Sequence, residues 1–156
     1  MALDKLFNEL FCGGAGSYEA SSKLVNSVTG ATAADLAPGL RFLVMWKEGL
    51  ARDSRELVEP IITALPVEPL LELIAGSDPK IAKDAAAALG HARYSPKTPS
   101  DRARLSKVLC ARFSADDLTG AFFKAALTEQ SQMLSLCLMA GQDFGARNAQ
   151  GRTALM

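Results

Sequence analysis

Apolar residues recur at intervals of three and four along most of the chain, the spacing that places side chains on one face of a helix. In residues 1–11 one such face comprises Leu3, Leu6, Phe7, Leu10 and Phe11. The glycine-rich residues 12–16 should end this helix, and Ser17 is expected to cap a second helix that reaches about Val28. No segment shows the alternation of apolar and polar residues that indicates a strand. The pattern therefore predicts an all-α protein.

Prolines lie within two of the helices predicted for the middle of the chain. A third helix is expected to begin near Thr32, to be interrupted at Pro38, and to resume over the apolar residues 40–46. The helix that opens near Asp53 contains Pro60. Because proline lacks a backbone donor and collides with the preceding turn, we expect a kink or a break there.

Residues 66–91 have the signature of a helical hairpin. A leucine-rich helix stops at Gly76, and an alanine-rich helix follows with Asp78 as its N-cap and Pro79 at its first position. This segment resembles a HEAT or armadillo unit, which implies that helix pairs stack side by side in a solenoid.

The sequence divides into two parts at a segment rich in serine and proline. Residues 1–94 are predicted to form a helical N-terminal domain, and residues 95–100 a linker. Residues 101–156 should contain one helix, over about 101–113, and then a different pattern.

Two short apolar runs follow in that C-terminal part, separated by the polar residues 128–132. The second run should end at Ala140 and Gly141, where glycine can close a helix. Residues 142–153 consist almost wholly of turn-forming and polar types. The order is therefore helix, turn, helix and extended loop.

This order and its residues resemble the ankyrin repeat. The matching residues are Ala125-Ala126, Leu136-Cys137-Leu138, Ala140-Gly141-Gln142-Asp143, Asn148 and Gly151. The segment starting at Thr153 falls where the next repeat should open, one ankyrin period of 33 residues after Gly120. Both openings lack the usual proline and histidine, as in a divergent capping repeat. Since about three repeats are needed for stability, we expect the chain to be the N-terminal piece of a longer protein.

The resemblance implies a fold class and a function. The fold is a helical-hairpin, solenoid-like domain with a C-terminal ankyrin-type repeat, and the function is non-enzymatic binding of a partner protein. In ankyrin proteins the contacts come from loop tips and from the first helix of each repeat, which here points to Lys124, Leu127, Arg147, Ala149, Gln150 and Arg152.

Two alternatives stay open. The first alternative to the adaptor function is an accessory or targeting domain of a larger enzyme or secreted effector whose catalytic part lies beyond residue 156. The second is a self-association module that forms homo-oligomers.

Composition narrows the function further. The 17 Lys and Arg balance the 17 Asp and Glu, so no global attraction to nucleic acid or to an anionic membrane is expected. Four cations of one predicted helix, Arg102, Arg104, Lys107 and Arg112, are interpreted as a solvated face.

The titratable and sulfur-containing residues give no sign of catalysis. The single histidine, His91, is expected to interact with the end of its helix, and no metal site, cofactor or catalytic group is predicted. Three cysteines without disulfide or metal spacing favour a reducing compartment such as the cytoplasm. Delivery of the protein into a host cell would leave no mark on this sequence.

Overall fold

The described part of the chain is helical throughout, apart from short connections and one β-bridge. The computed structural model describes residues 3–12, 16–49, 51–92, 94, 96–127, 136–137, 145 and 147–153. Its helices are α1 (Leu3–Phe11), α2 (Ser17–Val28), α3 (Ala33–Glu48), α4 (Arg52–Ala64), α5 (Val67–Ala75), α6 (Pro79–His91), α7 (Pro99–Arg112) and α8 (Ala115–Leu127). The predicted all-α fold class is confirmed.

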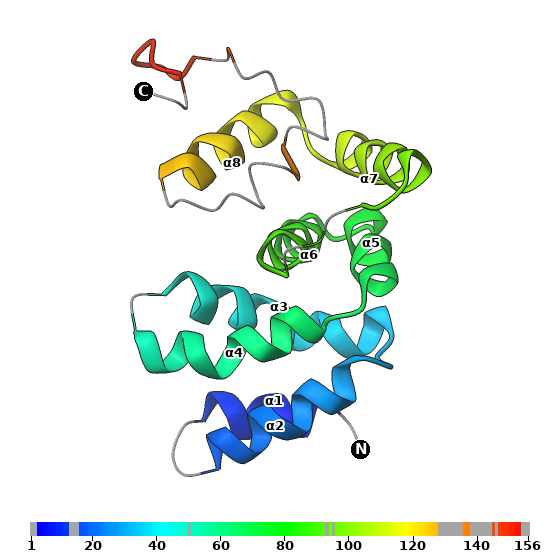
Figure 1. Ribbon diagram of the computed structural model, residues 1–156, viewed down its shortest axis with the longest axis vertical. Helices are drawn as coiled ribbons and strands as arrows, with labels where there is room; N and C mark the ends of the chain where they lie inside the picture. The colour runs from blue at the N-terminus through cyan, green and yellow to red at the C-terminus, as the bar shows by residue number, and fades with distance from the viewer. Residues whose placement is uncertain are drawn as a thin grey trace. The chain divides into compact units, whose positions relative to one another are not determined.

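The chain separates into two compact units, residues 1–92 (unit 1) and residues 93–156 (unit 2). Unit 1 contains three helical hairpins, α1–α2, α3–α4 and α5–α6, which follow one another along the ribbon in Figure 1. The first helices of successive hairpins touch, α1 with α3 and α3 with α5, and so do the second helices, α2 with α4 and α4 with α6. Each hairpin therefore packs against the next.

Helix starts follow local capping chemistry in three places. Thr32 caps α3, where its hydroxyl accepts from the amide of Asp35 while the Asp35 carboxylate accepts from the Thr32 amide. Asp78 caps α6 as expected, accepting from the amides of Lys80 and Ile81. Thr98 caps α7, so that the last two residues of the expected linker form the first turn of that helix.

The predicted cap of α2 is wrong. Gly16 occupies the N-cap position and Ser17 is already helical. The Ser17 side chain is 4% exposed, and its hydroxyl donates to the carbonyl of Leu10 at 3.2 Å. A buried hydroxyl needs a hydrogen-bond partner, and here that partner is the Leu10 carbonyl of α1. The serine ties the first hairpin together instead of capping its second helix.

The predicted interruption at Pro38 is also wrong, and α4 is not broken at Pro60. Both helices continue through their prolines. Each proline is exposed, so the carbonyl that loses its intrahelical donor can accept from water. Buried residues directly beyond each proline, Leu40 after Pro38 and Ile61 after Pro60, anchor the continuing helix in the core.

The tightest approach in unit 1 is between α1 and α3. A Cβ added at Gly39 would stand 2.6 Å from three carbons of the Phe7 ring, closer than real Cβ atoms come. The Phe7 side chain is 3% exposed and is stacked on Phe11 with ring centroids 6.0 Å apart. The ring therefore has little room to move away.

We expect Gly39→Ala to destabilise the protein by about 1–2 kcal/mol, because the overpacking against Phe7 outweighs the gain in helix propensity. Gly30→Ala is the matched control, since a Cβ at Gly30 meets nothing within 4 Å. The control should be neutral or slightly stabilising. Urea unfolding midpoints compare the two, and equal midpoints would show that Phe7 can move aside.

Candidate functional site

Residues 147–153 form a small hairpin in unit 2. Arg147 and Thr153 make an antiparallel bridge. The Asn148 amide donates to the Arg152 carbonyl at 2.9 Å, and the Gly151 amide donates to the Asn148 carbonyl at 2.9 Å. Gly151 has φ of 75°, in the left-handed region. This is the three-residue hairpin connection in which a turn is followed by a left-handed glycine.

Side chains of the hairpin reinforce its backbone. The Asn148 Oδ1 accepts from the amides of Gln150 and Arg152, both at 3.0 Å. The Arg147 Nη1 donates to the Gly151 carbonyl at 2.6 Å. These bonds are local, as expected of asparagine and glycine in turns. The hairpin is therefore fixed largely by its own residues.

All six residues expected to contact a partner are exposed. Four of them, Arg147, Ala149, Gln150 and Arg152, lie together on the hairpin. The other two, Lys124 and Leu127, lie at the C-terminal end of α8, where Leu127 is 86% exposed. The hairpin brings its four residues together within seven positions of the chain.

Other residues of the ankyrin-like pattern can be placed in part. Ala125 is 1% exposed, and Leu136 and Cys137 are helical and buried. Gly120 lies inside α8, which begins five residues earlier, at Ala115. The expected helix end at residues 140–141 and the second opening at residues 154–156 lie outside the described residues.

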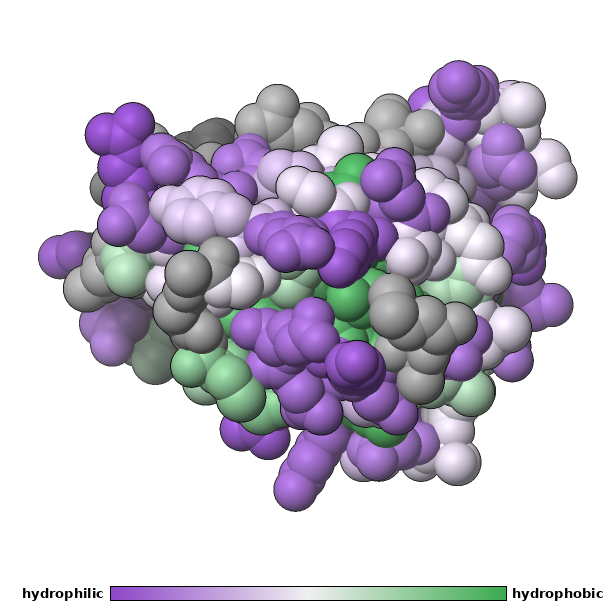
Figure 2. All heavy atoms as spheres, turned by 90° about the horizontal axis from the view of Figure 1, so that it is seen from below, coloured by the Kyte–Doolittle hydropathy of each residue, from purple (hydrophilic) through white to green (hydrophobic). Residues whose placement is uncertain are grey.

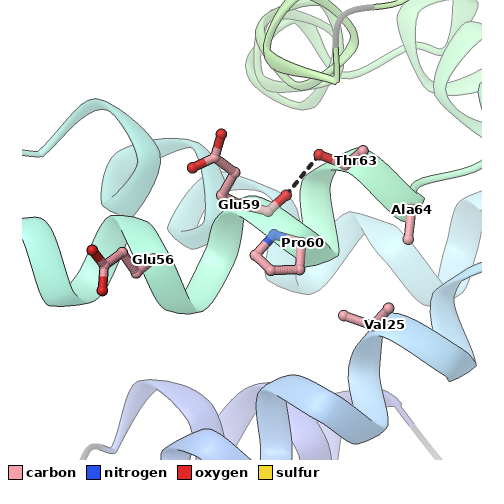
Figure 3. A pocket seen from close by; sticks show the side chains of 6 residues that line it. All are labelled: Val25, Glu56, Glu59, Pro60, Thr63 and Ala64. Atoms are coloured by element: carbon pink, nitrogen blue, oxygen red, sulfur yellow. Dashed lines mark hydrogen bonds between the residues drawn. The ribbon is translucent and has the colours of Figure 1, made fainter.

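An open depression of about 550 Å³ lies between α2 and α4 in unit 1. Figure 3 shows Pro60 and Ala64 directed toward Val25, while the side chains of Glu59 and Thr63 point away from it. The Glu59 carboxylate pairs with Lys47 at 3.3 Å, and the other acidic residue at the rim, Glu56, pairs with Arg52 at 2.7 Å. The depression thus has a small apolar floor and carboxylates that are already ion-paired.

A group of aromatic residues lies where α1 meets the exposed side of α3. The Phe11 ring is 5.1 Å from the Phe42 ring and 5.0 Å from the Trp46 ring, between centroids. Phe42 is 48% exposed and Met45 is 53% exposed, and Trp46 is half-buried. On the face turned to the viewer in Figure 2, hydrophilic side chains predominate and apolar atoms show between them.

Four titratable residues of unit 1 lie between α3 and α6, an arrangement that was not predicted from the sequence. The His91 Nε2 lies 3.2 Å from the Glu48 Oε1, and the His91 side chain is only 6% exposed. Arg41 and Asp84 interact electrostatically across the same interface. Arg41 and Glu48 are two turns apart on α3, as Asp84 and His91 are on α6. That shared spacing was the only sequence signal of the pairing.

Burial raises the pKa of the Asp84 carboxyl above its ordinary value. The charges of Arg41 and Lys83 oppose this rise, while those of Glu48 and Asp78 add to it. A carboxyl whose pKa is raised by folding is destabilising when ionised. The cost is therefore absent at acidic pH and appears as the pH rises through the pKa of Asp84.

Within the described residues, no three His, Cys, Asp or Glu side chains are grouped as metal ligands would be. None of the described helices is both long and apolar enough to cross a membrane. No protein-family model matches the chain, and no match is found among the curated proteins or the solved structures.

Asp84→Asn should stabilise the protein at pH 7 relative to the wild type and leave stability unchanged near pH 3.5, because the amide never acquires the charge that burial penalises. Urea midpoints at the two pH values measure the effect, with Glu72→Gln on the exposed side of α5 as control. A loss of stability at pH 7 would mean that the attraction to Arg41 outweighs burial.

Gly151→Ala should open the hairpin, because a residue other than glycine in the left-handed region costs about 1–2 kcal/mol. The amides of Asn148 and Gly151 should then exchange with solvent about 5- to 30-fold faster by NMR. Gly120→Ala is the control: a Cβ there meets nothing within 4 Å, and exchange in the hairpin should not change. Unchanged exchange in both variants would contradict the hairpin geometry.

Proposed function

We propose that the chain is a non-enzymatic adaptor that binds a partner protein through the 147–153 hairpin and the C-terminal end of α8, in the manner of the ankyrin repeat that it resembles. The hairpin is the observation that carries this proposal. It is closed by Asn148 and Gly151, the two turn residues of the ankyrin-like pattern, and it exposes all four candidate residues of the loop.

Binding through such a surface is favourable because little order has to be gained. The hairpin is held by the bonds from Asn148 and Arg147, so a partner meets a backbone that is already shaped. Leu127 adds apolar area, since its side chain is 86% exposed at the end of α8.

The helix packing of unit 1 supports a scaffold role as well. Its three hairpins pack successively, first helix to first helix and second helix to second helix, which is how repeat proteins build an extended core. This favours the HEAT or armadillo likeness of residues 66–91 and a solenoid-like unit 1.

A reducing compartment such as the cytoplasm fits the sulfur chemistry. Cys12 and Cys110 are exposed thiols, and exposed thiols oxidise readily outside reducing compartments. Burial raises the pKa of the third thiol, Cys137, to about 11, which keeps it protonated and unreactive at neutral pH.

The proposal is tested by photocrosslinking in cells that produce the protein. A benzophenone amino acid replaces Gln150 or Leu127, and the matched control places it at Glu72, which is exposed in unit 1. Both unit 2 positions should give an adduct with the same partner protein, identified by mass spectrometry, and the control should give none.

Other outcomes would reject the adaptor function. An adduct formed only from position 72 would place the interaction in unit 1. A covalent dimer of the chain would favour the self-association module. An accessory domain would be favoured if neither unit 2 position gave an adduct and if enzymatic activity were still present after crosslinking.

A further inference from the structure

The two units carry opposite net charges. Unit 1 has eight Lys and Arg against twelve Asp and Glu, a net charge of −4. Unit 2 has nine Lys and Arg against five Asp and Glu, a net charge of +4. The zero net charge of the whole chain conceals this division, and each unit presents its own field to a molecule that approaches within about one Debye length, roughly 8 Å at physiological salt.

Pairing of the charges also differs between the units. Four ion pairs join residues of unit 1 to one another, including Glu19 with Lys23 at 2.7 Å and Glu59 with Lys47 at 3.3 Å, and Glu48 lies 3.2 Å from His91. In unit 2 several exposed cations have no acidic group within 4.0 Å among the described residues, namely Lys97, Arg102, Lys107 and Arg152. Unit 2 therefore presents positive charge that the described part of the unit does not neutralise.

The hairpin carries one of these cations, Arg152, together with a second exposed arginine, Arg147. Residues 147–153 contain Arg147 and Arg152 and no acidic residue. Arg147 is held across the turn by its bond to the Gly151 carbonyl. It is bridged to Thr153, so Arg152, one position earlier, lies on the opposite face of the hairpin. Positive charge is thus available on both faces.

We propose that the 147–153 hairpin of unit 2 binds an acidic segment of its partner protein. This inference rests on the proposed adaptor function and specifies its partner. Guanidinium groups form charge-assisted hydrogen bonds with carboxylates, and Arg147 and Arg152 supply them.

The exposed residues favour a protein segment over a nucleic acid. Single-stranded nucleic acids are held by aromatic side chains on which bases stack. The large apolar side chains found exposed are Tyr18, Phe42, Met45 and Leu127, and among the described residues of unit 2 only Leu127 is one of them. Leu127 is aliphatic and offers no platform on which a base could stack.

A second copy of the chain fits less well as the source of the acidic groups. Four of the twelve carboxylates of unit 1 are already ion-paired within the unit, those of Glu9, Glu19, Glu56 and Glu59, and the carboxylate of Glu48 contacts His91. Two more, those of Asp35 and Asp78, accept hydrogen bonds as helix caps. Docking unit 1 of another copy on unit 2 would have to use the remaining five carboxylates of the unit or make these groups exchange partners.

Fluorescence anisotropy with the whole chain tests the proposal. The probe is a labelled 12-residue peptide of four Glu-Glu-Leu repeats, in about 50 mM salt so that screening is weak. We expect Arg147→Gln/Arg152→Gln to raise the Kd of this peptide about 5- to 10-fold, through the loss of two charge-assisted contacts. A peptide with Gln in place of Glu should bind more weakly than the acidic one by at least that factor.

The matched control is Lys5→Gln/Lys23→Gln, which removes the same charge from unit 1. Both lysines are exposed, with side-chain exposures of 71% and 50%. Their loss should change the Kd of the acidic peptide less than about 2-fold, because they lie in the other unit. Circular dichroism melting of both variants checks that each is folded before binding is compared.

Each contrary outcome overturns the inference. Equal weakening by the two double variants would mean that net charge alone governs binding. The surface would be assigned to nucleic acid if a 12-nucleotide single-stranded DNA bound more tightly than the acidic peptide and if Arg147→Gln/Arg152→Gln lost that binding. Dimers seen by light scattering in the wild type and lost in that variant would assign it to a second copy.

This experiment and the crosslinking test fail separately. If a partner protein crosslinks to positions 127 and 150 but the acidic peptide binds no better than its glutamine counterpart, the adaptor function holds and the acidic character of the partner is wrong. If no protein adduct forms from either position, the adaptor function itself is wrong, whatever the peptide does.

Discussion

The packing of α3 is the constraint on which unit 1 depends. This helix contacts α1, α4, α5 and α6, so four of the five other helices of the unit meet it directly. Its buried stripe includes Leu36, Leu40 and Leu43, each no more than 1% exposed. At Gly39 the stripe has no side chain, which leaves the space that the Phe7 ring occupies. The close approach of α1 to α3 therefore depends on the absence of a side chain at Gly39, while α2 docks the same hairpin on α4.

Much of the helical fold could be predicted because its signals are local. Asp78 and Pro79 start α6 through bonds within one turn, and the apolar face of α1 follows from spacing alone. The prolines misled because packing is not local. A proline inside a helix costs about 3 kcal/mol, whereas each buried leucine or isoleucine beyond the proline gains about 1.5–3 kcal/mol, so two such residues together exceed the cost. At Pro38 and Pro60 the buried residues on both sides decide the outcome, and the helices continue.

The candidate sites also combine local features, which could be predicted from the sequence, with long-range contacts, which could not. The turn of the 147–153 hairpin could be foreseen, since asparagine and glycine specify it within four residues. The pairing of Glu48 with His91 could not, because it joins residues 43 positions apart that meet only when α6 packs on α3. The opposite charges of the two units were also hidden, since the totals cancel until the boundary at residue 92 is known.

Because the charges are divided between the units, the electrostatic selectivity of the proposed adaptor depends on the distance of the partner. At distances beyond the size of the molecule the charges cancel, so polyanions such as nucleic acids and anionic membranes exert little general attraction. Close to unit 2 the excess of four positive charges acts within a Debye length and favours an acidic partner. In the proposed adaptor, charge selects the class of partner. The shape of the hairpin, set by the bonds of Asn148 and Arg147 and by the left-handed Gly151, then discriminates among acidic partners.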